Sequence, residues 1–96
     1  MKKVKVKGAL RTYMFSLLYV AMIAGINTGY FSVVAHPDRI FRRVKDWNDE
    51  CNHCAWEIGI AAARNSVTIE RNYSSMRRKN QYRQEFWDYI SSTFYV

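Results

Sequence analysis

The chain has 96 residues, 49% of them hydrophobic, and a formal net charge of +7. This length allows at most one small domain, which excludes a multidomain enzyme. The basic balance would suit a nucleic-acid-binding protein, but the most basic stretch directly precedes an apolar segment, where lipid phosphate groups are the better partner. We therefore expect neither a nucleic acid nor a small-molecule substrate.

The first twelve residues form a basic head. It contains five cationic side chains and no acidic one: Lys2, Lys3, Lys5, Lys7 and Arg11. Cationic clusters beside an apolar segment bind anionic phospholipid head groups, so we expect the five side chains to contact lipid. Basic residues also favour the inner side of a membrane, which predicts that the head lies in the matrix or cytoplasm.

Residues 13–35 are uncharged and predict a transmembrane helix. Twenty-three helical residues would span about 34 Å, which exceeds a hydrocarbon core of roughly 30 Å. A cleavable signal peptide is the alternative, because Val33, Val34 and Ala35 resemble a cleavage site. The apolar stretch is longer than a typical signal core of roughly 7–15 residues. We therefore expect a retained anchor.

Small residues recur within this segment. Gly25 and Gly29 form a GxxxG motif that Ala21 extends by one further turn. Glycines at this spacing let a second helix approach closely, and the amide of Asn27 needs a partner in lipid. We expect Ala21, Gly25, Asn27 and Gly29 to pack against neighbouring membrane helices.

The residues after the anchor predict a long helical arm. Pro37 suits the first turn of a new helix, and apolar residues then repeat at spacings of four and three. These residues form a partner-binding seam: Ile40, Val44, Trp47, Cys51, Cys54, Ile58 and Ala62. The β-branched residues near Val67 weaken the helix. A second, shorter helix is predicted from Tyr73 onward.

These patterns predict an all-α fold with three parts: the head (1–12), one transmembrane helix (13–35) and an extramembrane helical arm (36–96). Only one glycine, Gly59, and no proline follow Pro37. Because turn signals are missing, the arm is not expected to double back into an independent globular core. Its apolar seam would then need to lie along other proteins.

The only motif that resembles a chemical site is Cys51-Asn52-His53-Cys54. Two thiols and one imidazole are one ligand short of a closed zinc site, and a redox CxxC would need a preceding strand. Packing in the seam and a disulfide remain open for Cys51 and Cys54. We predict no catalytic residue, no metal ligand and no cofactor. Asn72 begins a weak glycosylation sequon.

These features favour a structural accessory subunit of a membrane complex. We expect a respiratory complex of the mitochondrial inner membrane as the host, with the head in the matrix and the arm in the intermembrane space. NADH:ubiquinone oxidoreductase is the first choice, and cytochrome c oxidase, the bc1 complex and ATP synthase are alternatives. Two other classes stay open: a type II signal-anchored binding protein, and a membrane-tethered redox or metal protein that uses Cys51, His53 and Cys54.

Overall fold

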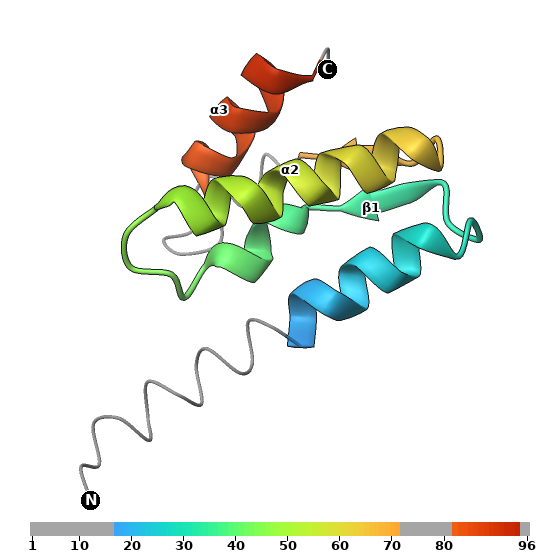
Figure 1. Cartoon of the computed structure of the whole chain (residues 1–96), viewed down its shortest axis with the longest axis horizontal. Coiled ribbons are helices and arrows are strands. Elements are labelled where there is room, and N and C mark those ends of the chain that lie inside the picture. Colours follow the sequence, from blue (N-terminus) through green and yellow to red (C-terminus); the bar gives the residue numbers. More distant parts are fainter. Residues whose placement is uncertain (1–16, 72–81, 95–96) are drawn as a thin grey trace, which may run out of the picture.

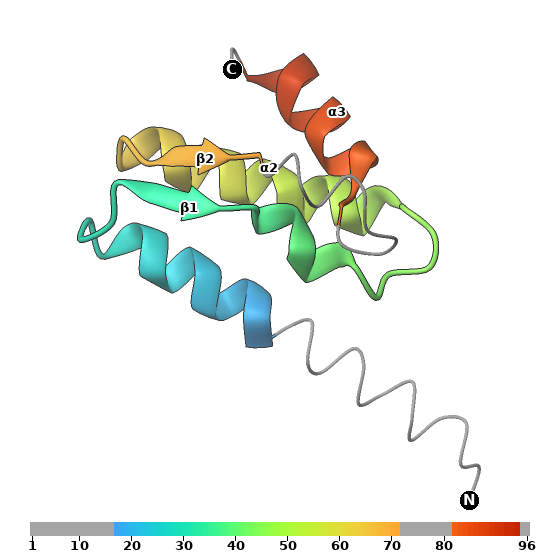
Figure 2. The same ribbon diagram turned by 180° about the vertical axis from the view of Figure 1, so that it is seen from behind.

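A computed structural model describes residues 17–71 and 82–94. Within the described residues, the first helix covers 17–27 and ends there. The later elements are strand β1 (Val33–Ala35), the 3-10 helix η1 (Pro37–Phe41), helix α2 (Asp49–Arg64), strand β2 (Thr68–Glu70) and helix α3 (Gln84–Thr93). The two views in Figures 1 and 2 show α2 between the first helix on one side and α3 on the other.

A polar turn ends the first helix. The Thr28 hydroxyl donates to the Gly25 carbonyl at 2.6 Å, and it accepts the amide of Tyr30 at 3.2 Å. Gly29 follows with a φ of 75°, a left-handed conformation that glycine adopts without a steric penalty and that commonly ends helices. The chain therefore reverses here and returns beside the first helix as β1.

The two strands pair in parallel, with Val33 opposite Thr68 and Ala35 opposite Glu70. Backbone bonds extend the pairing beyond both ends of β1, since Thr68 donates to Ser32 at 2.8 Å and His36 donates to Glu70 at 2.7 Å. Parallel strands need a long crossover, and η1 and α2 supply it. The unit is therefore a β-α-β arrangement with a helix in front of it.

Helix α2 begins with a clear N-terminal cap. Asn48 has an extended backbone, and its side-chain oxygen accepts the amide of Cys51 at 3.0 Å. Asp49 and Glu50 occupy the first turn and Arg64 the last, as the helix dipole favours. The helix buries one side, made of Cys51, Ala55, Ile58, Gly59, Ala61 and Ala62.

A buried carboxylate joins the start of α3 to η1. Asp38 is 1% exposed, and its Oδ2 atom accepts the backbone N–H of Arg83 at 2.8 Å. The Arg83 guanidinium donates to the Val44 carbonyl at 2.5 Å and lies 5.7 Å from the centre of the Trp47 ring. We call this set of contacts the Asp38–Arg83 clamp.

The core forms where α2, α3, η1 and the first helix meet. Its largest side chains are aromatic: Phe86 lies 5.6 Å from Phe41 and 4.9 Å from Trp87, measured between ring centres. The core residues are Ile26, Phe41, Cys51, Ala55, Ile58, Ala61, Ala62, Val67, Phe86, Trp87 and Ile90. They come from all the helices and from Val67 beside β2, and Val34 and Ile69 of the two strands pack against them, so the described elements form one packed unit.

This architecture shows that the predicted fold class is wrong. The described residues form three helices, a short 3-10 helix and a parallel strand pair around a buried core, where the sequence predicted an all-α anchor and arm. Residues 13–35 are not one helix, because the turn at Thr28 and Gly29 divides them and residues 33–35 are a strand. Across residues 17–71 and 82–94, no helix has both the length and the apolar character needed to cross a bilayer.

The contact between Gly59 and Phe94 gives a testable prediction. A Cβ atom added at Gly59 would overlap the Phe94 ring. Alanine is otherwise favoured over glycine inside a helix by about 1 kcal/mol. In a Phe94→Ala background, we expect Gly59→Ala to raise the free energy of unfolding by that amount. In the native background, the overlap with the Phe94 ring is expected to cancel most or all of this gain. Urea unfolding of the four proteins of this double-mutant cycle measures the difference. Equal effects in both backgrounds would contradict the contact.

Candidate functional site

A cluster of polar side chains joins the first helix to α2. The Tyr19 hydroxyl donates a short hydrogen bond to Oε2 of Glu57, and Oε1 of the same carboxylate lies 2.8 Å from Nε2 of His53. His53 and Glu57 are one turn apart on α2, a spacing that brings side chains together on one face of a helix. Trp56 is stacked beside His53, with 6.2 Å between ring centres.

The environment of this cluster raises two pKa values. Burial, and then the neighbouring Glu57 carboxylate, raise the pKa of the Tyr19 hydroxyl above its ordinary value. Burial also raises the pKa of the Cys54 thiol, with Cys51 and Glu57 adding to the effect. Both groups therefore keep their protons at neutral pH. Since the thiolate is the reactive form of cysteine, Cys54 is a weak nucleophile here.

The structure places both cysteines of the CxxC motif on α2 as free thiols, with Cys51 buried in the core and Cys54 half-buried. Both side chains thus lie in or against the core. No group of three or more metal-binding side chains is found in the part of the chain that the structure describes. His36, the second histidine, lies in the turn between β1 and η1, away from the motif in sequence and in a different element.

The predicted membrane-packing residues do not form one helical ladder. Gly29 lies beyond the end of the first helix, and a Cβ atom at Gly25 or at Gly29 would meet no atom within 4 Å. Ala21 is exposed on the first helix. Asn27 accepts a hydrogen bond from the Asn65 amide at 3.0 Å, which ties the two helix ends together. Asn27 thus has its partner within the chain.

The predicted partner-binding seam divides into two parts. Ile58 and Ala62 are buried on α2, so they are core residues. Ile40, Val44 and Trp47 precede α2 and are partly buried against the same core, where the Trp47 indole donates to Asn52 at 2.7 Å. The seam therefore packs inside the molecule. The five cationic residues of the head, and Asn72, lie outside the described residues.

An exposed apolar surface takes the place of the predicted seam. We define it by six side chains that are 48–89% exposed: Leu17, Leu18, Val20, Tyr30, Phe31 and Val33. At about 100° per residue, Leu17 and Val20 share an arc of the first helix with Ala21 and Ala24, and all four are exposed. The predicted transmembrane helix over residues 13–35 did not separate these exposed side chains from the buried ones, because it placed the whole segment within a membrane.

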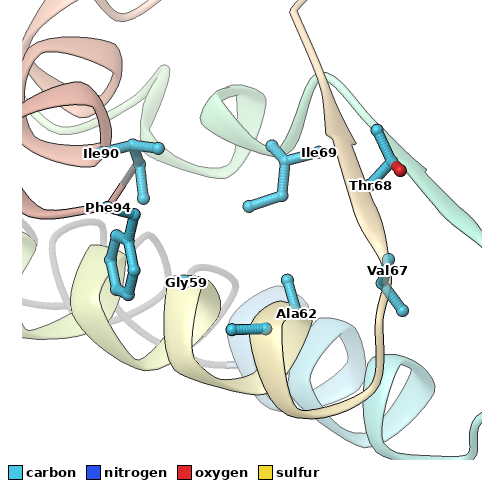
Figure 3. A pocket seen from close by; sticks show the side chains of 8 residues that line it. Gly59, Ala62, Val67, Thr68, Ile69, Ile90 and Phe94 are labelled. Carbon is cyan, nitrogen blue, oxygen red and sulfur yellow. The ribbon is translucent and has the colours of Figure 1, made fainter. Parts of the chain in front are cut away.

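A second feature is an apolar pocket of about 230 Å³ between α2, β2 and α3. Figure 3 shows the Phe94 ring and Ile90 on one side of it and Ile69 and Val67 on the other. Gly59 and Ala62 form its floor on α2, and Thr68 is the one polar residue among those labelled. A recess with so little polar lining offers shape but hardly any groups to orient a ligand.

Comparison with known protein families, curated proteins and solved structures finds no match to this chain. The structure has two distinctive features: a polar cluster in which the pKa values of Tyr19 and Cys54 are raised, and an apolar surface that the described residues leave uncovered.

The raised pKa values of Tyr19 and Cys54 predict a loss of stability in alkali. Both groups keep their protons in the folded state at pH values where the unfolded chain, with ordinary pKa values near 8.5 for Cys and 10 for Tyr, begins to lose them. Their contribution is thus complete below about pH 8.5 and is lost as pH rises above it. We expect the urea concentration at which half of the protein is unfolded to decrease as the pH is raised from 8 to 10.

A variant isolates these two groups from the others that titrate in alkali. Tyr19→Phe with Cys54→Ala removes both titrating protons while keeping most of the packing. We expect its urea midpoint to fall less over the same pH range than that of the native protein. Identical pH profiles for the two proteins would show that neither group contributes.

Proposed function

We propose that the protein is a non-catalytic accessory subunit of a membrane-associated complex and that it attaches through the exposed apolar surface. The observation that supports this proposal is the character of the first helix. Ile26 is buried in the core on one side, whereas Leu17, Leu18 and Val20 are exposed on the other. A helix that is apolar all round is normally covered on all sides. The uncovered side therefore suits a binding partner.

The chemistry of the polar cluster agrees with a binding role. The Tyr19 hydroxyl and the Cys54 thiol have raised pKa values, and the Glu57 carboxylate is shared between Tyr19 and His53. Each group is thereby held in a fixed, protonated or bonded state. Such an arrangement joins two helices, and it suits a rigid platform better than acid–base or thiol chemistry.

The host that we propose is a respiratory complex of the mitochondrial inner membrane. The support for this choice is the sequence of the head, whose five cationic and no acidic residues suit both import and contact with anionic lipid. In this proposal the protein lies at the edge of the complex and contributes to its assembly. It takes part in no electron transfer itself.

Native gel electrophoresis of gently solubilised membranes tests this proposal. We expect the native protein to migrate with a large complex, and the variant Leu17→Gln, Val20→Gln to migrate mostly as free protein. Glutamine preserves helix propensity and adds no charge, so the fold is retained. Trp56→Gln, which changes an exposed apolar residue outside the surface, is the matched control. A native protein that migrates alone would overturn the proposal.

A further inference from the structure

The exposed apolar surface begins close to the most basic part of the chain. Arg11, the last cationic residue of the head, is six residues before Leu17. Six residues span at most about 21 Å even when fully extended. Arg11 is therefore tethered near the start of the apolar face of the first helix, and the four lysines of the head precede it in the sequence.

The surface itself contains no charged residue. Residues 17–27, the part of the first helix that the structure describes, contain no acidic or basic side chain, so no charge on their exposed side opposes contact with hydrocarbon. At about 1.5 Å per residue this described part spans about 16 Å, and it could lie along a membrane surface with its exposed side at the boundary between head groups and acyl chains.

Two aromatic residues lie at the far end of the same helix. Tyr30 is 89% exposed and Phe31 is 58% exposed. Tyrosine is enriched where a membrane meets water, because its ring favours acyl chains and its hydroxyl favours water, whereas phenylalanine contributes apolar area alone. The apolar face is thus bounded by the basic head before it in sequence and by an aromatic turn after it.

From this arrangement we propose that the exposed apolar surface lies flat on a membrane that contains anionic lipids, with Leu17, Val20 and Phe31 entering the interface and the basic head contacting lipid phosphates. The inference rests on the proposed function and names the partner of its surface. It needs no membrane-spanning segment. Binding combines two weak signals, apolar insertion and charge attraction, a combination that gives peripheral proteins stable attachment.

Sedimentation of the full chain with vesicles tests this inference. We compare phosphatidylcholine vesicles with vesicles that contain 30% phosphatidylglycerol, a composition of about one anionic lipid in three that resembles anionic leaflets. We expect binding to the anionic vesicles to be at least about tenfold stronger, and to weaken when the salt concentration rises from 0.05 M to about 0.5 M. Equal binding to both vesicles, or to neither, would overturn the inference.

The apolar part of the surface is tested with variants that leave net charge unchanged. Leu17→Gln with Val20→Gln, and separately Phe31→Gln, are expected to weaken binding to anionic vesicles about tenfold or more, because each removes buried apolar area. Trp56→Gln is expected to bind like the native protein. Far-ultraviolet circular dichroism confirms that each variant is folded. Unchanged binding of all the variants would overturn the role of the apolar face.

The outcomes separate this inference from the proposed function. If the surface variants leave the native complex but vesicles do not bind the protein, the surface binds another protein and the lipid inference fails alone. If vesicle binding depends on the surface while the native protein migrates alone on native gels, the lipid inference stands and the accessory-subunit proposal fails.

Discussion

Phe86→Ala is expected to lower the free energy of unfolding by about 3–5 kcal/mol, the usual cost of deleting a buried phenyl ring. Phe86 is 0% exposed and contacts the rings of both Phe41 and Trp87. A domain of this size has only about 5–15 kcal/mol of total stability, so the loss is a large part of it. Urea unfolding followed by tryptophan fluorescence measures the change.

The matched control for Phe86 is Phe31→Ala. Phe31 is 58% exposed, so removing its ring leaves no internal cavity, and we expect a change within about 0.5 kcal/mol. If the two variants lose similar stability, the core described here is wrong. If Phe86→Ala proves too unstable to purify, Phe86→Leu keeps most of the volume and is expected to lose less.

Asp38→Ala is expected to lower the free energy of unfolding by about 2–3 kcal/mol, because it leaves the buried N–H of Arg83 without its charged acceptor. The substitution releases one end of the Asp38–Arg83 clamp, so α3 loses its hydrogen bond to η1 and keeps the contact between the Phe86 and Phe41 rings. Hydrogen exchange of the α3 amides, measured with the urea midpoint, is expected to show faster exchange in α3 than in α2.

Asp38→Asn is the sharper comparison for the clamp. Its amide oxygen can still accept the Arg83 N–H at nearly unchanged geometry, so most of the stability should remain. A hydrogen bond to a charged acceptor contributes roughly twice as much stability as one to a neutral acceptor. The stability that Asp38→Asn still loses is expected to come from this difference. If the Asn and Ala variants lose the same stability, the hydrogen bond is not the reason why Asp38 is buried.

The sequence was informative for α2. The seam placed Cys51, Ile58 and Ala62 on one side of a helix, and all three are buried there. The β-branched residues near Val67 were expected to weaken the helix, and α2 ends at Arg64, before β2 begins at Thr68. These features depend on neighbouring residues, which is the information that periodicity contains.

The start of α2 was predicted wrongly for a physical reason. The spacing of apolar residues continues from Ile40 through Trp47 without a break, so the pattern suggested one long helix. The actual helix begins after Asn48, whose side chain caps it, and Asp49 and Glu50 follow in the first turn. Such a cap followed by acidic residues is a known start signal, and it should have taken precedence over the seam.

The apolar segment shows a similar ambiguity. A long uncharged run fits a membrane span, but it also fits a helix, a turn and a strand that are each partly buried in one domain. The turn signal is Asn27-Thr28-Gly29. It was overlooked because Gly29 was interpreted as part of a GxxxG helix-packing motif. The Tyr19–Glu57 bond and the Asp38–Arg83 clamp join residues that are far apart, and no local pattern identifies such partners.

The distance along the chain between bonded partners has a consequence for how the protein folds. The bonds that fasten the first helix to α2, and η1 to α3, join residues 38–45 positions apart. Closing a loop of that size costs about 3 kcal/mol of chain entropy before any contact compensates for it. We therefore expect slower folding than in a helical bundle of equal length. During that delay the apolar first helix has no cover, so newly made chains are most prone to aggregate before α2 docks.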